Sequence, residues 1–344
     1  MMSPEVSVII PFTGKAIFMD EAVASVMQQS FQNFEVVLVE NHATDLSREM
    51  ATSWTRNYPG KIRLVFEKKK GAAAARNRGI QESRGKFLAF LDSDDRMKPN
   101  RLLRQWEWLS QDFESVLLGA WKDRLSPDGN QLVSRSEKPQ VPKWASILFE
   151  EDKRFQADPL HEPQTSTFFL RKDYALEIGG FDEAFDPFWL EDTDFVFRMY
   201  QKGKIGIVPE SLVEYRSHNE EEENKRIFDI LNIRNHGIFF QKLKYRFQEI
   251  GMSGAQKALR RISSRWLRES ATKIAYFEGG LPISKILLKR ALWADKKDIR
   301  NIFYIMRFSL HSRFWPRPFG RSPENIKILP EEFNFEWAQT FLQI

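Results

Sequence analysis

Two aspartates separated by one residue, Asp92-Ser93-Asp94, carry the first chemical signal in the sequence. They follow the apolar run Phe87 to Leu91, which predicts a buried strand. Side chains two positions apart on extended backbone point to the same side, so both carboxylates can face one site. Carboxylates presented in this way can hold a hard divalent cation, which in turn can bind a diphosphate. The alternative is an Asp-rich turn or helix cap before Pro99.

Short apolar runs alternate with helical patterns around this cluster. The expected strands are Val6–Pro11, Phe34–Val39, Ile62–Phe66 and Phe87–Leu91, and the expected helices are Asp20–Gln29, Leu46–Tyr58 and Ala72–Ser83. This alternation, with a spacing of about 25 residues, predicts an α/β fold with a doubly wound, mostly parallel sheet flanked by helices. Ligands bind at the carboxyl ends of the strands in such sheets, which is where Asp92 and Asp94 lie.

The alternation of strand and helix patterns is less regular after Trp106. A turn at Pro127 to Asn130 is expected between two short strands. A further strand is expected over Thr165–Arg171, with helices over Lys172–Ile178 and Glu191–Lys202. The acidic run Glu220 to Glu223 is expected to be a solvated loop or linker.

The end of the chain differs in charge and pattern. From Lys225 onward there are 23 Lys and Arg against 10 Asp and Glu, whereas residues 1–224 hold 29 basic and 37 acidic residues. This asymmetry predicts an acidic front domain, residues 1–224, and a basic, mainly helical C-terminal region, residues 225–344. The expected helices there are Ala258–Ala275, Ile283–Ala294 and Asp298–Leu310, with a turn at Glu278 to Pro282.

Several classes of protein are excluded by composition. The sequence has no cysteine, which excludes disulfides, thiolate metal sites and a cysteine nucleophile, and fits a reducing compartment. No apolar run approaches the ~20 residues that cross a bilayer, and the first residues lack the pattern of a signal peptide. The expected location is therefore cytoplasmic, either free or peripheral on the inner face of the membrane.

The order of the motifs resembles the family 2 glycosyltransferases of the GT-A fold. The resemblance covers roughly residues 4–218 and rests on Val6–Pro11, Asn33–Val39, Ala74–Gly79, Asp92–Asp94, Gly180–Glu183, Glu191–Asp194 and Tyr215–His218. It implies an inverting, metal-dependent transfer of a sugar from a nucleotide-diphosphate donor, expected to be a UDP-sugar, to an acceptor hydroxyl. The implied setting is surface polysaccharide or glycolipid synthesis.

Carried over position by position, the resemblance implies a donor site with a divalent metal, Mn²⁺ or Mg²⁺. Asp94 would coordinate the metal, His218 would be a further ligand, and Asp92 would lie near the ribose and the metal. The cation would neutralise the departing nucleoside diphosphate. The implied nucleotide-sugar-binding residues are Pro11, Glu40, Asn41, Arg76, Asp92 and Ser93. The plain alternatives are a solvent-facing helix residue for Arg76 and a structural or exposed histidine for His218.

Glu191-Asp192 resembles the acceptor-site motif of the family. Asp192 would be the general base that takes a proton from the attacking hydroxyl, and Glu191 would orient the acceptor. Acidic residues at a helix start, stabilised by the helix dipole, are a simpler explanation that is compatible with catalysis.

Two departures from the family pattern fall in the expected base pocket. Relatives carry two aspartates and Gly-Ser where this chain has Glu40-Asn41-His42-Ala43, and one of those aspartates accepts a hydrogen bond from the uracil ring. Asn41 carries no charge and brings a donor. Pro11 to Gly14, Pro-Phe-Thr-Gly, replaces the usual Pro-Thr-Tyr-Asn. A rival hypothesis is therefore a non-catalytic GT-A module that binds nucleotide or glycan. A nucleotidyltransferase is disfavoured because Thr13-Gly14-Lys15 is too short for a glycine-rich phosphate loop.

The basic region suggests partners beyond the donor and a glycan or lipid-linked acceptor. Basic residues alternate there with apolar ones: Arg260, Arg261, Arg265, Arg268, Lys289 and Arg290 with Trp266, Leu267 and Leu287. They could dock on an anionic membrane surface, or be the solvated faces of helices that pack on the catalytic domain or on another copy of the chain, giving a homo-oligomer. No nucleic-acid motif is found, and nucleic acid is not an expected partner.

Overall fold

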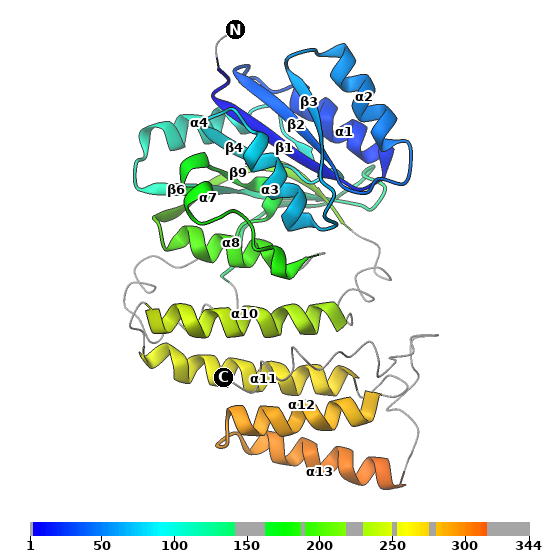
Figure 1. Cartoon of the computed structure of the whole chain (residues 1–344), viewed down its shortest axis with the longest axis vertical. Coiled ribbons are helices and arrows are strands. Elements are labelled where there is room, and N and C mark those ends of the chain that lie inside the picture. Colours follow the sequence, from blue (N-terminus) through cyan, green and yellow to red (C-terminus); the bar gives the residue numbers. More distant parts are fainter. Residues whose placement is uncertain are drawn as a thin grey trace. The chain divides into compact units, whose positions relative to one another are not determined.

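The computed structural model describes residues 3–141, 162–186, 190–217, 230–249, 253–274 and 280–314. The chain divides into two compact units, with the described residues up to 217 in the first and those from 230 onward in the second. Strands and helices alternate in the first unit, and the second is built from long helices (Figure 1). The expected boundary near Lys225 lies outside the described residues.

Four parallel strands form one half of the sheet in the first unit. In spatial order they are β3 (Ile62–Phe66), β2 (Phe34–Glu40), β1 (Val6–Phe12) and β4 (Phe87–Phe90). Their connections contain α1 (Ala16–Met27), α2 (Ser47–Asn57) and α3 (Ala72–Glu82). β2 is buried along its whole length, as the apolar run Val36 to Val39 predicts for a strand covered on both faces, and it also buries Glu35 and Glu40. Because these four strands are parallel, their carboxyl ends lie at the same edge of the sheet, where the sequence predicts the ligand site.

The sheet continues with strands of mixed direction. After β4 come β8 (Phe169–Arg171), β6 (Ser115–Leu125), β9 (Lys204–Arg216) and β5 (Arg96–Met97), and β7 (Leu132–Glu137) pairs with β6. β8 is antiparallel to both β4 and β6, whereas β6 and β9 are parallel. Within the described residues the nine strands form one sheet flanked by helices, which is the α/β architecture that the sequence predicts. The prediction of a mostly parallel sheet holds only for β1 to β4, because four of the eight pairings in the described sheet are antiparallel.

Two elements of the first unit, α4 and β9, could not be predicted from the sequence pattern. α4 (Arg101–Gln111) buries the polar residues Arg101 and Gln105 among its apolar ones, which hides the helical periodicity. Arg101 Nη2 donates to the carbonyls of Phe90 (2.9 Å) and Phe168 (3.0 Å) and so ties α4 to the sheet. β9 contains Pro209, which normally argues against a strand, but its pairing with β6 skips residues 209 and 210 at a bulge.

Short elements bring the later motifs to the sheet. The strand expected over Thr165–Arg171 is only half correct, because its first residues form the 3-10 helix η1 (Thr165–Thr167). α7 (Lys172–Glu177), η2 (Glu183–Phe185) and α8 (Glu191–Tyr200) follow. The Phe195 ring of α8 stacks on Phe181, with ring centroids 4.1 Å apart. This stacking attaches the start of α8 to the segment around Gly180.

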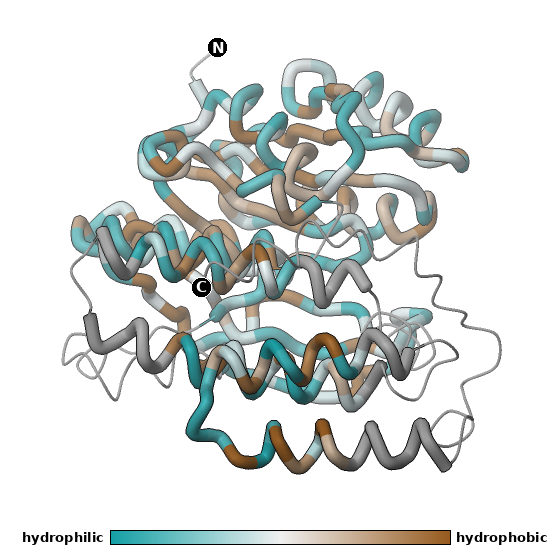
Figure 2. Tube along the Cα trace, turned by 60° about the horizontal axis from the view of Figure 1, so that its bottom comes forward, coloured by the Kyte–Doolittle hydropathy of each residue, from teal (hydrophilic) through white to brown (hydrophobic). Residues whose placement is uncertain are grey.

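The second unit contains α10 (Ile230–Glu249), α11 (Ser253–Ile274), α12 (Gly280–Ala294) and α13 (Ile299–Phe314). Hydrophobic and hydrophilic residues are interspersed along them (Figure 2). Leu267, Leu287 and Arg268 are buried, so the prediction that they belong to an exposed amphipathic surface is wrong. None of the helices in the described ranges has an apolar stretch long enough to cross a bilayer.

Candidate active site

The Asp92-Ser93-Asp94 segment forms a turn directly after β4, at the carboxyl end of the parallel strands. The Asp95 amide donates to the Asp92 carbonyl (3.1 Å), which closes the turn. The Asp92 amide donates to Ser166 Oγ (3.0 Å) in η1. Asp92, Ser93 and Asp94 are each half-buried, so their side chains remain within reach of a ligand.

Arg76 joins two of the predicted site segments. Its Nη2 donates to Asp92 Oδ1 (2.9 Å) and its Nη1 to Glu191 Oε1 (2.7 Å). The side chain is 7% exposed, and the guanidinium carbon lies 5.3 Å from the centre of the Phe181 ring. Arg76 is therefore not a solvent-facing helix residue, because α3 points it inward between the two acidic motifs.

Glu191 is buried at the first position of α8. Burial raises its pKa most strongly and the neighbouring Asp192 raises it further, whereas Arg76 opposes the shift; the resulting pKa is about 7. Its second oxygen, Oε2, is buried and has no hydrogen-bond partner in the described structure. Glu191 can therefore hold a proton near neutral pH and retains a free oxygen.

A second glutamate, Glu162, lies beside Asp192 and was not predicted from the sequence. The Thr193 hydroxyl donates to Glu162 Oε1, and the Thr193 amide donates to Asp192 Oδ1 (2.7 Å). Burial, followed by the charge of Asp192, raises the pKa of Glu162 from 4.5 to about 7. Glu162 belongs to no motif and lies some 30 positions before Asp192, so only the folded chain reveals the pair.

Asp94 carries a basic neighbour that the sequence did not predict. Lys15 Nζ lies 3.1 Å from Asp94 Oδ2. Lys15 precedes α1 in the left-handed conformation, with φ +61°, which is uncommon for a residue with a side chain. Its side chain is half-exposed, and an exposed ion pair of this kind contributes at most about 1 kcal/mol. An incoming ligand of Asp94 can therefore displace Lys15 at little cost.

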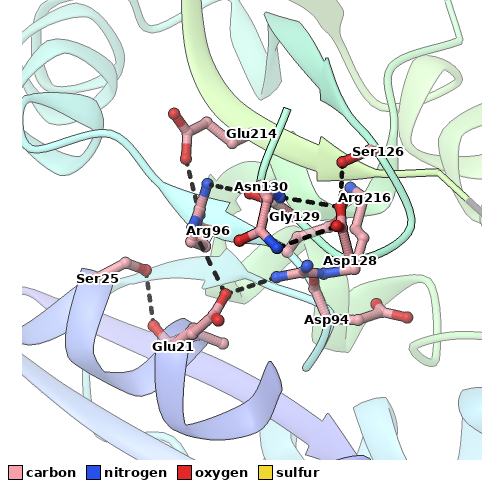
Figure 3. A network of polar contacts seen from close by, with 12 residues as sticks. Glu21, Ser25, Asp94, Arg96, Ser126, Asp128, Gly129, Asn130, Glu214 and Arg216 are labelled. Carbon is pink, nitrogen blue, oxygen red and sulfur yellow. Dashed lines mark hydrogen bonds and ion pairs between the residues drawn. The ribbon is translucent and has the colours of Figure 1, made fainter. Parts of the chain in front are cut away.

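Arg216, the last residue of β9, braces the turn that holds Asp94 (Figure 3). Its Nε donates to the Asp94 carbonyl (2.8 Å), its amide to Asp95 Oδ1 (2.9 Å), and its Nη2 to Glu21 Oε2 (2.6 Å). Gly129 packs so closely that a Cβ there would lie 1.9 Å from Arg216 Nη1. Arg216 and the β6–β7 turn thus fix the backbone of the acidic turn from one side.

Asp95 is a third carboxylate of this turn, and it is fully buried. Burial raises its pKa well above the ordinary value, and the charges of Asp94 and Asp92 raise it further. Its Oδ2 has no hydrogen-bond partner among the described residues. Burial also raises the pKa of Tyr215 at the end of β9, and the charges of Asp95, Asp94 and Asp92 raise it further. The turn thus gathers the carboxyl groups of Asp92, Asp94 and Asp95, and two of them already pair with the basic residues Arg76 and Lys15.

The donor set suits a hard divalent cation in its chemistry. Asp92 and Asp94 offer carboxylate oxygens from one turn, which Mn²⁺ and Mg²⁺ accept. Across the described ranges, however, no group of three or more acidic or histidine side chains is gathered closely enough to form a complete site. His218, the predicted further ligand, lies outside those ranges. Any remaining ligands would have to come from a donor phosphate, from water or from residues beyond them.

The end of β2 holds the surrounding loops together. Glu40 Oε1 accepts from the Ala43 amide (2.7 Å) and from Arg48 Nη2 (3.0 Å). Asn41 Nδ2 donates to the carbonyls of Glu67 (3.1 Å) and Lys69 (2.7 Å).

Asn41 Oδ1 in turn accepts from the Gly71 amide (3.0 Å). Both amide hydrogens of Asn41 are thus used within the protein, and its side chain organises the loop that leads into α3. Pro11 lies in β1 opposite Val39, at the same edge of the sheet.

The start of α3 is fixed by the segment that precedes α8. Asp186 Oδ1 and Oδ2 accept from the amides of Ala73 (2.9 Å) and Ala74 (3.2 Å). Asn77 exchanges two hydrogen bonds with the backbone of Phe181: its Nδ2 donates to the carbonyl (2.8 Å) and its Oδ1 accepts from the amide (2.7 Å). The Gly180–Glu183 motif is thereby docked on the helix that carries Arg76.

Comparison with known proteins shows which protein family the chain resembles. The model of Glycosyl transferase family 2 matches residues 7–179, just over half of the chain. An uncharacterized glycosyltransferase of Nostoc sp. is 28% identical over 218 residues, which cover 62% of this chain and 65% of the relative.

Two Bacillus subtilis proteins also match. The putative teichuronic acid biosynthesis glycosyltransferase TuaG is 34% identical over 31% of this chain and 43% of its own length. The minor teichoic acid biosynthesis protein GgaA is 29% identical over 63% of this chain and 48% of its own. The matches therefore cover less than two thirds of each of these relatives.

Two solved structures support the fold. The crystal structure of GalNAc-T7 with UDP, GalNAc and Mn²⁺ aligns with a TM-score of 0.53 at 18% identity, covering 63% of this chain and 44% of that one. Staphylococcus aureus TarS aligns with a TM-score of 0.50 at 16% identity, covering 94% of this chain and 57% of that one. Together with the family match and the sheet topology, these structures identify the first unit as a GT-A fold. The chain belongs to the family 2 glycosyltransferases.

Proposed function

We propose that the chain transfers a sugar from a nucleoside-diphosphate donor, expected to be a UDP-sugar, to an acceptor hydroxyl with inversion at the anomeric carbon. The observation that carries the proposal is the buried guanidinium of Arg76, bonded to both Asp92 and Glu191. It brings the acidic turn after β4 and the start of α8 into one site. Membership of the family supports the same reaction class.

On the donor side, Asp92 and Asp94 are proposed to hold Mn²⁺ or Mg²⁺, with His218 as a further candidate ligand. The bound cation supplies positive charge that stabilises the departing diphosphate. Arg76 adds a buried positive charge beside Asp92, and Lys15 adds a half-exposed one beside Asp94. Pro11, Glu40, Asn41 and Ser93 are proposed to shape the nucleotide pocket, and we expect Asn41 to act through the loop it organises.

On the acceptor side, Asp192 is proposed to take the proton of the attacking hydroxyl. It is half-buried between Glu191 and Glu162, whose pKa values are raised to about 7. Neighbouring carboxyls that hold a proton add no negative charge next to Asp192. Glu191 is proposed to orient the acceptor, because its oxygen Oε2 is without a partner in the described structure.

The acceptor is proposed to be a growing surface polysaccharide or glycolipid. The names of TuaG and GgaA refer to teichuronic and teichoic acid synthesis, which supports this setting. We also propose the functional division that the charge pattern suggests. Residues 1–224 would carry catalysis, and residues 225–344 would contact the acceptor, a membrane surface or another copy of the chain.

Calorimetry tests the donor and the metal together. UDP, GDP, dTDP and CDP are titrated with and without Mn²⁺ into the wild type and Asp94→Ala. Manganese-dependent binding of one nucleotide that is lost in the variant is the expected result. The absence of binding to all four nucleotides by folded protein would contradict a nucleotide-diphosphate donor.

One observation favours the rival hypothesis of a non-catalytic nucleotide- or glycan-binding module. Both amide hydrogens of Asn41 are engaged by backbone carbonyls, so the base pocket departs from the family pattern. Slow hydrolysis of the sugar donor separates the two hypotheses. An enzyme would show hydrolysis that Asp192→Asn abolishes, and a binding module would show none.

A further inference from the structure

Helix α13 of the second unit carries an exposed apolar stripe. Ile299, Ile302, Phe303 and Met306 are 75%, 42%, 58% and 54% exposed. Their spacing of three and four residues places them on one side of the helix. We call these four residues the α13 face. Figure 2 shows the hydrophilic turn after α12 followed by hydrophobic residues along this helix.

The opposite side of α13 is anchored in the unit, which fixes the direction of the α13 face. Asn301 is fully buried, and its Nδ2 donates to Ser264 Oγ (2.9 Å) on α11. Its Oδ1 accepts from Arg268 Nη1 (3.0 Å), and the same nitrogen donates to Asp298 (2.5 Å). Rotation of the helix to bury the stripe would break this polar cluster inside the unit, which is costly.

Basic residues surround the start of the α13 face. Lys296 and Lys297 are exposed in the turn between α12 and α13. Arg300 is exposed beside the stripe and bonded to Asp298 at 2.7 and 2.9 Å. Trp293, half-exposed near the end of α12, adds an aromatic side chain of the type found at membrane interfaces. From 253 to 314 the sequence has 14 Lys and Arg against four Asp and Glu.

We propose that the α13 face docks the protein on an anionic lipid surface, with the apolar side chains in the headgroup region and Lys296 and Lys297 on the lipid phosphates. An apolar stripe bordered by lysine and arginine is the pattern of an interfacial helix. A symmetric contact between two copies through this face would bring these like charges together, which favours lipid over a second copy. The proposal rests on the proposed function and extends it, because docking on the lipid surface would bring the protein to a lipid-linked acceptor.

Vesicle flotation with the full chain, without nucleotide, tests the proposal. The vesicles are phosphatidylcholine with or without phosphatidylglycerol, at low and high salt. The wild type is expected to float with the anionic vesicles at low salt and to be released as salt rises. Ile302→Ser combined with Phe303→Ser is expected to weaken the partitioning by at least about tenfold, because two apolar contacts are lost.

Two matched controls distinguish binding through the α13 face from nonspecific hydrophobic adsorption and from nonspecific electrostatic attraction. Phe113→Ser removes a side chain that is 81% exposed on the first unit and is expected to leave flotation unchanged. Lys296→Gln with Lys297→Gln is expected to reduce binding more than Arg260→Gln with Arg261→Gln. The latter pair removes two exposed charges from α11.

Three results would overturn the proposal. The first is that the folded wild type does not float with anionic vesicles at low salt. The second is equal flotation of the wild type and the Ile302/Phe303 variant. The third is a dimer in sedimentation equilibrium that this variant dissociates in the absence of lipid, which would assign the face to a second copy. Nucleotide titration of the same samples reports separately on the proposed function, so its failure would be distinguishable.

Discussion

Arg76 is the residue on which the geometry of the site depends most directly. It is buried between Asp92 and Glu191, and removal of its guanidinium would leave both carboxyls without the cation that they share. Breaking a buried ion pair from one side is strongly destabilising. Arg76→Ala is therefore expected to lower the free energy of unfolding by about 3 kcal/mol and to weaken nucleotide binding by at least about tenfold. Urea denaturation and calorimetry measure the two effects.

Arg78 provides the control for this prediction. It lies two positions further along α3, is partly exposed, and pairs with Glu82 at 2.8 Å along the same helix. Arg78→Ala is expected to change stability by less than about 1 kcal/mol, because an exposed pair of this kind contributes little. Equal losses in the two variants would mean that the buried position of Arg76 does not matter.

The contributions of single residues were only partly predictable from the sequence. Arg76, Asp92, Asp94 and Glu191 lie in motifs, and the structure brings Arg76 together with Asp92 and Glu191, and Asp94 together with Lys15. Further neighbours come from distant segments, such as Glu162 beside Asp192 and Arg216 beneath Asp94. A single sequence records spacing along the chain, whereas these contacts depend on how the sheet folds.

At the scale of elements, the start of α3 is the part that positions Arg76. Its first free amides are satisfied by Asp186, from a segment more than 110 residues away. Loss of such a cap costs about 1 to 2 kcal/mol. Asp186→Ala is expected to lower stability by this amount and to weaken nucleotide binding, because the helix that carries Arg76 loses its fixed start. Asp186→Asn keeps an acceptor and is expected to lose less.

A carboxylate at another helix start is the comparison for Asp186. Asp173 lies exposed in the first turn of α7, and Asp173→Ala is expected to change stability by no more than about 0.5 kcal/mol. Thermal unfolding of Asp186→Ala, Asp186→Asn and Asp173→Ala, measured side by side, tests whether Asp186 caps α3. If Asp186→Ala behaves like Asp173→Ala, the contact with α3 is not a structural cap.

Most elements of the first unit with a regular apolar pattern were predicted to within a few residues, whereas α4 and β9 were not predicted. β3 is found at its predicted bounds, Ile62–Phe66. α4 was missed because Arg101 and Gln105 occupy its buried face, and β9 because a bulge accommodates Pro209. In both cases the tertiary structure satisfies a residue that local preference would exclude.

At the scale of the whole molecule, the opposite charges of the two parts of the chain suggest a division of tasks. The acidic turn and the start of α8 lie in the first unit, where a cation and a diphosphate would neutralise one another's charge. The second unit carries the basic helices and the α13 face. The sequence predicts this division through charge alone, but it cannot show which apolar residues of an amphipathic helix are buried. Leu267 and Leu287 proved internal, and the exposed stripe lies on α13.

Two carboxyls of the site with raised pKa values make the stability of the whole protein depend on pH. Glu162 and Glu191 have pKa values raised from 4.5 to about 7 in the folded protein. Between these values the folded state keeps protons that the unfolded chain has released, so stability falls as pH rises through this range. A shift of this size in one group corresponds to roughly 3 kcal/mol. The wild-type unfolding free energy is therefore expected to decline between about pH 5 and pH 8.

Glu162→Gln isolates one of these groups, because glutamine stays neutral and its oxygen can still accept from the Thr193 hydroxyl. The variant is expected to lose less stability than the wild type as pH rises, so that the difference between them changes by roughly 3 kcal/mol between about pH 5 and pH 8. Urea titrations at a series of pH values measure it, with the exposed Glu107→Gln as control. Parallel curves for the wild type and Glu162→Gln would show that Glu162 is ionised throughout. That result would contradict the prediction.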